Sequence, residues 1–201
     1  IYVVPHGIPD IPLQSSESFK KKLRLENKIV LSTFGLLSKG KGIEYMIKSL
    51  PSLIKKYPNI IYLVIGETHP AVRKNEGEKY RNKLVDLVKK LGLQNNVKFY
   101  NKYLSLDEIM ECISATDIYV CTNLDKNQIV SGTLSYAIGS GKAVISTPSV
   151  YAEEVLDKER GILVKFKNPK SFSDAIDKIL SDNELRNKLE NNAYSFGRSM
   201  I

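Results

Sequence analysis

The stretch that decides the fold is residues 29–66, which read IVLSTFGLLSKGKGIEYMIKSLPSLIKKYPNIIYLVIG. It begins and ends with short apolar runs rich in β-branched residues. Between these runs, apolar side chains recur every three or four positions until Pro58. The short runs predict strands, and the spacing between them predicts an amphipathic helix. A strand, a helix and a second strand in this order are typical of a parallel βαβ unit.

The same alternation continues to the end of the chain. It predicts an α/β fold with a doubly wound, mostly parallel, Rossmann-like sheet of about six strands and helices on both faces. Strands are expected at 29–34, 60–66, 97–100, 117–121, 143–147 and 161–165. Helices are expected at 43–57, 80–91, 106–115, 131–140, 169–180 and 183–196, with Ser105 as an N-cap and Gly141 closing the fourth.

Residues 1–28 carry three prolines, serines and a lysine run, which indicate an irregular lead-in with at most one short helix. Residues 29–201 are then expected to form one Rossmann-like domain. The chain opens on Ile1 rather than on methionine or a signal sequence, so we expect it to be part of a longer protein.

Composition narrows the classes of protein. No run approaches the roughly 18–20 apolar residues of a membrane helix. Two cysteines, Cys112 and Cys121, make neither a disulfide framework nor a four-ligand zinc site, which favours a cytoplasmic location, including the cytoplasmic face of a membrane. The formal charge of +8 favours phosphorylated ligands or an anionic membrane surface. The lysines are not interleaved with aromatic residues, which argues against nucleic acid.

Ligands of such sheets bind at the carboxyl ends of the strands. The first expected strand leads into residues 34–42, FGLLSKGKG, where Gly35 allows close backbone approach and Lys39 and Lys41 supply charge for phosphate oxygens. This loop matches neither G-x-G-x-x-G nor G-x-x-x-x-G-K-[ST], so a dinucleotide fold and a P-loop ATPase lose support. A plain turn remains the alternative to a phosphate site.

Two further loops carry candidate residues at the same edge. His69 follows the second expected strand, although a lone loop histidine is more often solvated or hydrogen-bonded than catalytic. The loop after the fourth strand ends in Ser131-Gly132-Thr133, where open backbone N–H groups at a helix start suit a diphosphate. An N-cap serine followed by a packing glycine is the structural alternative.

Six motifs together resemble the C-terminal half of a family 4 glycosyltransferase of the GT-B fold. They fall in the family's order and are Pro5-His6-Gly7, Phe34-Gly35-Leu36-Leu37 with Lys41-Gly42, Val64-Ile65-Gly66, Ala115-Thr116-Asp117, residues 137–147 and Arg160-Gly161-Ile162-Leu163-Val164. The combination of Phe-Gly-Leu-Leu, Gly-x-Thr-His-Pro and Gln-x-x-Ser-Gly-Thr-Leu resembles a mannosyltransferase-like subgroup.

The resemblance implies the nucleotide-sugar-binding half of a retaining enzyme that transfers a hexose, mannose or glucose, from a nucleoside diphosphate sugar. The acceptor, a saccharide or lipid-linked saccharide, would be held mainly by an N-terminal domain outside this chain, with peripheral membrane contact as a further expectation. No cofactor and no metal are implied.

The resemblance also assigns roles to individual residues. Lys41 and Gln128 would be catalytic. Donor phosphates would lie against Gly35, Lys39, Lys41, Ser131, Gly132 and Thr133. The sugar, ribose and base would meet His69, Asn101, Lys102, Gln128 and Tyr136.

Departures from the family pattern leave alternatives open. Leu36 stands where family members usually carry an arginine, and Gln128 and Tyr136 stand where they usually carry two glutamates. Glutamine and tyrosine can still hydrogen-bond sugar hydroxyls, but neither brings negative charge. The alternatives are a degenerate, non-catalytic nucleotide-binding or interaction domain and half of a sugar-nucleotide epimerase. The scarcity of histidines argues against the epimerase.

Overall fold

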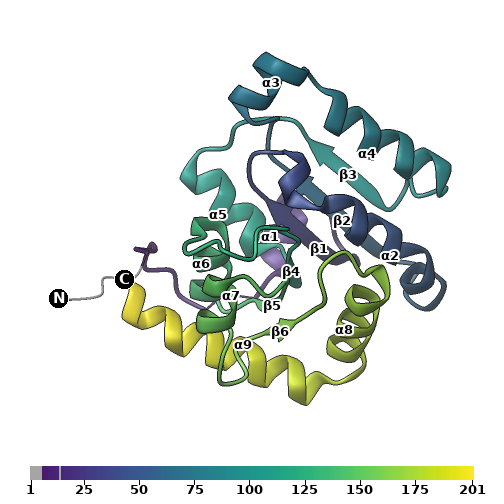
Figure 1. The fold of residues 1–201 in the computed structure, drawn as a ribbon. Coiled ribbons are helices and arrows are strands. Elements are labelled where there is room, and N and C mark those ends of the chain that lie inside the picture. Colours follow the sequence, from purple (N-terminus) through teal and green to yellow (C-terminus); the bar gives the residue numbers. More distant parts are fainter. Residues whose placement is uncertain (1–5, 14) are drawn as a thin grey trace.

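The computed structural model describes residues 6–13 and 15–201, and its centre is one all-parallel sheet (Figure 1). The strand order across the sheet is β3-β2-β1-β4-β5-β6. The strands are β1 Ile29–Phe34, β2 Ile60–Ile65, β3 Val97–Tyr100, β4 Ile118–Cys121, β5 Ala143–Ser146 and β6 Ile162–Leu163. The doubly wound α/β prediction is confirmed.

Helices cover both faces of this sheet. Their bounds are α1 Glu17–Lys22, α2 Ile43–Lys56, α3 Pro70–Glu76, α4 Lys79–Lys90, α5 Leu106–Ser114, α6 Gly132–Gly139, α7 Val150–Val155, α8 Pro169–Ser181 and α9 Asn183–Gly197, with short 3-10 turns η1 Lys39–Lys41 and η2 Arg198–Met200. Ser105 caps α5 through a full capping box with Glu108, as its sequence position predicts.

The core is divided in two by the sheet. Alternate residues of β2 enter opposite clusters, because successive side chains of a strand point to opposite faces. Ile60, Tyr62 and Val64 pack with α2, α4 and α8, whereas Ile61 and Leu63 pack with α5, α6 and α7. Both faces of the central strands are therefore buried, which explains why their sequences are almost uniformly apolar.

Several expected boundaries change, and helices α3 and α7 lie outside the six helical ranges expected from the sequence. The last strand was expected over 161–165 but has only two residues, since it pairs with β5 alone at the sheet edge. Helix α3 forms where the sequence predicts only a loop. It has no buried residue, so no apolar period announces it, and it depends on Pro70 at its first turn and the His69 side chain as N-cap.

The lead-in packs onto the domain from His6 onward. Its one short helix, α1, carries Lys20, whose buried ammonium lies 2.8 Å from an Asp117 carboxylate oxygen. The other carboxylate oxygen accepts 3.2 Å from Arg186, and Asp117 also accepts the backbone N–H of Val30 at 2.7 Å. Asp117 therefore ties the lead-in, β1 and α9 together at the amino edge of the sheet.

Candidate functional site

The candidate site lies at the carboxyl edge of the sheet, where β1 and β4 are neighbours and the winding direction reverses. The loops after β1 and β2 touch at two glycines. Gly66 has a φ of +134°, and a Cβ built on it would lie 2.2 Å from the Gly35 carbonyl oxygen. Leu37 and His69 continue this contact, with the His69 N–H donating to the Leu37 carbonyl at 3.0 Å.

The β1 loop is also attached to the loop after β4. Gly42 has a φ of +61°, and a Cβ there would lie 2.7 Å from the Thr122 carbonyl oxygen. The Leu124 N–H donates to the Gly40 carbonyl at 2.8 Å, and the Thr122 hydroxyl donates to the Lys41 carbonyl. These bonds hold Lys41 beside the β4 loop, and its Nζ lies 3.5 Å from the Cβ position that Gly35 leaves empty.

We call the small hollow between these loops the polar pocket. Its lining includes Lys41, Asn123, Gln128, Ser131 and Thr133. The structure therefore brings together four of the residues that the sequence analysis selected. Lys41 carries the only formal charge in this lining, and no carboxylate faces it from the described residues.

The start of α6 forms one wall of the polar pocket. The Ser131 hydroxyl oxygen accepts from the Leu134 N–H at 3.4 Å, so its side chain caps the helix as the sequence predicts. The N–H groups of Gly132 and Thr133 have no acceptor within the helix, because they belong to its first turn. They point outward with the positive end of the helix dipole. This wall can bind an anion without any further cationic side chain.

Behind the wall, Tyr119 fixes the Thr133 side chain. The Tyr119 phenol donates to the Thr133 hydroxyl at 2.9 Å, and its ring stacks on Phe34 with centroids 5.9 Å apart. Complete burial raises the pKa of Tyr119, so the phenol stays protonated and remains a donor at every physiological pH.

A second hollow, the apolar pocket, adjoins the first and has a volume of about 110 Å³. Its walls are Phe34, Leu36, Ile65, Leu104 and Ile109, and its rim includes Glu67 and Lys102. Thr133 lines both pockets, so they form one continuous site. Leu36, the departure from the family's arginine, contributes apolar surface here.

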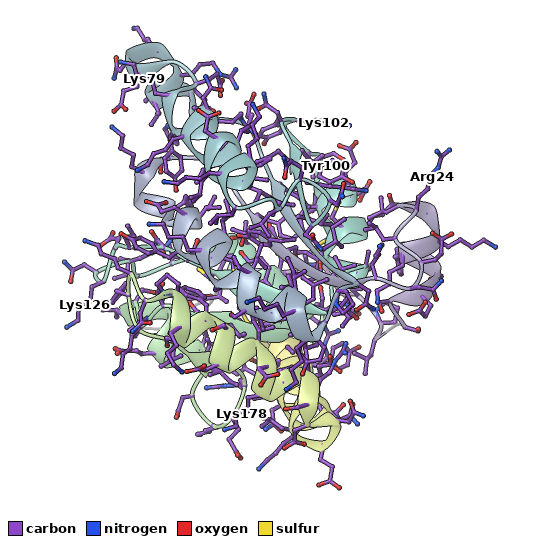
Figure 2. The ribbon with its side chains drawn as sticks, turned by 90° about the vertical axis from the view of Figure 1, so that its right-hand side faces the viewer. Arg24, Lys79, Tyr100, Lys102, Lys126 and Lys178 are labelled. Atoms are coloured by element: carbon purple, nitrogen blue, oxygen red, sulfur yellow. The ribbon has the colours of Figure 1, made fainter. Side chains whose placement is uncertain are left out.

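Lys102 is the labelled rim residue beside β3 in Figure 2, and it forms an ion pair with Glu108. The other basic side chains labelled there are exposed on separate sides of the molecule: Arg24, Lys79, Lys126 and Lys178. Positive charge is thus dispersed over the surface. The polar pocket owes its cationic character to Lys41 and the α6 start.

Besides Gly132 of the α6 start, four of the selected residues line neither pocket. Lys39 forms an exposed ion pair with Glu76 of α3 at 2.7 Å. Asn101 is exposed. The exposed His69 ring accepts the Ala71 N–H at 3.2 Å through Nδ1, which explains its presence as a helix cap.

Tyr136 is the fourth. It is half-buried, and its ring meets the His6 imidazole edge-on with centroids 5.7 Å apart. The same imidazole covers the α6 start, since a Cβ on Gly132 would lie 2.9 Å from His6 Nε2. Pro5 of the first motif lies outside the described residues.

Asn123 is the site residue that sequence reasoning missed. Its side-chain amide donates to Gln128 Oε1 and holds that side chain against the pocket. Its only sequence signal is its place two residues after the apolar strand 118–121, and many loop asparagines share such a place.

Among residues 6–13 and 15–201, no group of three or more histidine, cysteine, aspartate or glutamate side chains is arranged to hold a metal ion. Within the same described part, none of the helices has the length and apolar character needed to cross a membrane.

Fold and site geometry together define a doubly wound α/β domain with a candidate ligand site at the topological switch point. Comparison with known families identifies it further. The model of the family described as glycosyl transferases group 1 matches residues 14–196, and the chain belongs to that family.

Curated relatives agree with this assignment. The chain is 32% identical over 201 residues to the uncharacterized glycosyltransferase MJ1069 of Methanocaldococcus jannaschii, covering 98% of this chain and 47% of the relative. It is 26% identical over 180 residues to the putative glycosyltransferase YtcC of Bacillus subtilis, covering 88% of this chain and 42% of the relative. The chain therefore spans about half the length of the curated relatives it matches.

Solved structures share the fold. The crystal structure of the C-terminal domain of a group 1 glycosyl transferase, LpcC, from Francisella tularensis is 27% identical with a TM-score of 0.81, covering 94% of each chain. Anabaena Alr3699/HepE, solved in complex with UDP and glucose, is 20% identical with a TM-score of 0.80, covering 92% of this chain and 47% of that one. At that identity, the second likeness establishes the fold alone.

Proposed function

We propose that residues 29–201 form the donor-binding domain of a retaining, family 4, mannosyltransferase-like glycosyltransferase. It would transfer a hexose, mannose or glucose, from a nucleoside diphosphate sugar. The observation that carries this proposal is the polar pocket, where Lys41 and the α6 start converge at the switch point. The UDP and glucose bound by the Anabaena protein, which shares the fold, support the same ligand class.

In this proposal, the diphosphate lies at the mouth of the polar pocket. The Lys41 ammonium and the N–H groups of Gly132 and Thr133 would bind its oxygens. Negative charge grows on the leaving diphosphate as the glycosidic bond breaks, so groups fixed around it stabilise the transition state more than the ground state. The Lys41 ammonium lies beside Gly35, 3.5 Å from the position that a Cβ of this glycine would take.

The base would enter the apolar pocket, whose aromatic and aliphatic walls suit a flat, weakly hydrated ring. Lys102 at its rim would contact the base edge, and the exposed Asn101 stands beside it.

The sugar would face Gln128, and the ribose would face the Tyr136 hydroxyl. The Tyr136 ring already packs against His6, so only its hydroxyl would be available to the ribose. Lys39 and His69 would contribute only if they left their contacts with Glu76 and Ala71.

The acceptor, a saccharide or lipid-linked saccharide, would be held mainly by a domain outside these 201 residues. The formal charge of +8 supports work near an anionic membrane surface.

Isothermal titration calorimetry with GDP, UDP and ADP, followed by GDP-mannose and UDP-glucose, tests the proposal. We expect binding of at least one nucleotide with a dissociation constant of roughly 10–1000 µM, because one domain supplies only part of a two-domain cleft. We expect no sugar transfer by this chain alone. No heat with any nucleotide at millimolar concentration would instead favour the degenerate domain.

A further inference from the structure

The side-chain amide of Gln128 has a defined orientation. Its Oε1 accepts a hydrogen bond from Asn123 Nδ2. The backbone of Gln128 is fixed as well, because its carbonyl accepts the Tyr151 N–H at 3.0 Å at the start of α7. The loop that carries both amides is thus attached to the domain, and the amide pair lies in the lining of the polar pocket.

The direction of this hydrogen bond follows from a third group. Asn123 Oδ1 accepts the backbone N–H of Asp125 at 3.4 Å. A backbone N–H can only donate, so the atom of Asn123 that faces it must be the oxygen. The Asn123 nitrogen therefore faces Gln128, and Gln128 must present its oxygen in return. This series of hydrogen bonds assigns the oxygen and nitrogen positions of both side-chain amides.

The consequence concerns the opposite end of the Gln128 amide. Oε1 uses one of its two lone pairs for Asn123, whereas Nε2 keeps both of its N–H donors for a ligand and can accept nothing. A glutamate at this position would present oxygen to the ligand and could only accept. This protein thus offers a donor sugar N–H donors where a glutamate would offer acceptor oxygens. The lining of the polar pocket contains no carboxylate.

We propose that Asn123 is a positioning residue that makes Gln128 a hydrogen-bond donor, and that the donor sugar carries an acceptor-only group there, a carboxylate or an amide carbonyl. This inference rests on the proposed donor-binding function, but it replaces mannose or glucose as the sugar with a hexuronate or an N-acetylhexosamine. A plain hydroxyl can accept the same bond, but it brings a proton that Nε2 cannot accept. A carboxylate receives a charge-assisted bond, which is about twice as strong as a neutral one.

The experiment uses two charge-matched variants of the same loop. Asn123→Asp keeps the acceptor for the Asp125 N–H but offers Gln128 a second oxygen, so the Gln128 amide should rotate and present Oε1 to the ligand. Asn127→Asp adds the same charge at an exposed position of the same loop, where the backbone N–H donates to Asp125 and the side chain makes no hydrogen bond to Gln128. Comparing the two variants separates the effect of the Gln128 amide orientation from the effect of the added negative charge.

Side-chain amide signals in ¹⁵N-correlated NMR spectra give a readout that needs no nucleotide. Asn123→Asp should shift the Gln128 side-chain NH2 pair, because Nε2 gains an acceptor, whereas Asn127→Asp should leave it in place. An unmoved Gln128 pair in Asn123→Asp would overturn the inference even if every nucleotide binds as proposed.

Affinity gives the second readout, with UDP, UDP-glucose, UDP-glucuronate and UDP-N-acetylglucosamine as probes. We expect the native chain to bind the glucuronate or the N-acetyl form roughly fivefold more tightly than UDP-glucose. Asn123→Asp should abolish or reverse this preference, measured relative to the UDP affinity of the same variant because the added carboxylate repels the diphosphate. Asn127→Asp should keep the preference.

Two results of the affinity measurements would also overturn the inference. One is equal binding of all three sugars by the native chain. The other is an equal loss of preference in both variants. If the calorimetry shows that the protein binds GDP rather than UDP, the corresponding GDP sugars are used as probes. Failure of every nucleotide to bind overturns the proposed function, and the substrate inference with it.

Discussion

At the scale of single residues, Lys41 and Lys39 differ in what their ammonium groups meet. Lys41 lines the polar pocket, whereas Lys39 pairs with Glu76 on the exposed side of the same turn. Lys41→Ala should therefore weaken nucleoside diphosphate binding by about 1.5–3 kcal/mol, roughly 10- to 150-fold, because a charge-assisted phosphate contact is lost. Calorimetry with the nucleotide that binds best checks this.

Lys39→Ala is the matched control and should change diphosphate affinity by less than twofold. Nucleosides, which lack phosphate, should bind both variants equally. A Lys41→Ala variant that keeps its diphosphate affinity within a factor of two would remove the β1 loop from the phosphate site.

Lys142 is a buried charge remote from both pockets. Burial lowers its pKa to about 8 from the ordinary 10.5, and its Nζ donates to the Ser114 carbonyl at 2.8 Å. Between these values the unfolded chain holds a proton that the folded chain has released. The free energy of unfolding should therefore rise with pH from about 8 to 10.5, and this gain is lost as pH falls through 8.

Comparison of urea unfolding for the native chain and Lys142→Met at pH 7 and pH 9.5 isolates this contribution. We expect the native chain to gain roughly 1–2 kcal/mol relative to the variant over that interval, since one proton corresponds to about 1.36 kcal/mol per pH unit. A constant difference between the two proteins would mean that Lys142 titrates normally in the folded state.

At the scale of loops and helices, two glycines with nearly the same backbone make a direct comparison. Gly42 has a φ of +61° and Gly92 a φ of +68°, but only Gly42 has close neighbours, with Thr122 oxygen 2.7 Å from its Cβ position. Gly92→Ala should lower the free energy of unfolding by about 1 kcal/mol from backbone strain alone. Gly42→Ala should cost about 2–4 kcal/mol, because the two loops must separate.

Chemical denaturation measures both costs, and calorimetry adds a functional check. Gly42→Ala should also weaken diphosphate binding, since Lys41 is held by the same loop contact. Equal stability of the two variants would show that the loop contact contributes nothing.

The sheet and most helices could be predicted because their signals are local. Buried strands such as β2 are continuous apolar runs, and α2 and α8 have one apolar stripe each. Helix α3 could not be predicted, because it buries no residue and depends on a cap and a proline. The length of β6 depends on pairing with β5, which is a tertiary property.

The residues of the candidate site also fall into those that could be predicted from the sequence and those that could not. Lys41 and the α6 start could be selected, because each lies at a strand end or helix start and the fold brings such ends together, whereas Gln128 was selected through the family resemblance. Asn123 could not, because its role depends on a hydrogen-bond chain through Asp125. Glu76 belongs to α3, so its ion pair with Lys39 could not be predicted for the same reason as that helix.

At the scale of the whole molecule, the lead-in and the last helix close over α6. The Ile8 N–H donates to the Met200 carbonyl at 3.0 Å, and the Ile8 side chain fills the space beside Gly139. Ile8 is only 8% exposed, whereas Leu13 is 52% exposed. Ile8→Ala should therefore lower the free energy of unfolding by about 1.5–3 kcal/mol, and Leu13→Ala by less than about 0.5 kcal/mol.

Thermal and urea unfolding of these two variants test whether the lead-in belongs to the cooperative unit. If Ile8→Ala unfolds like the native chain, residues before 15 do not share the stability of the domain.

The β4 loop, described above as the carrier of Asn123 and Gln128, also affects how a ligand arrives. Its backbone is bonded to the β1 loop through Leu124 and to α7 through Lys126 and Gln128. This loop has already lost its conformational entropy when the domain folds, so it does not have to become ordered when a nucleotide binds. Its capture should proceed in one kinetic step, with a rate proportional to ligand concentration and no slow closing phase.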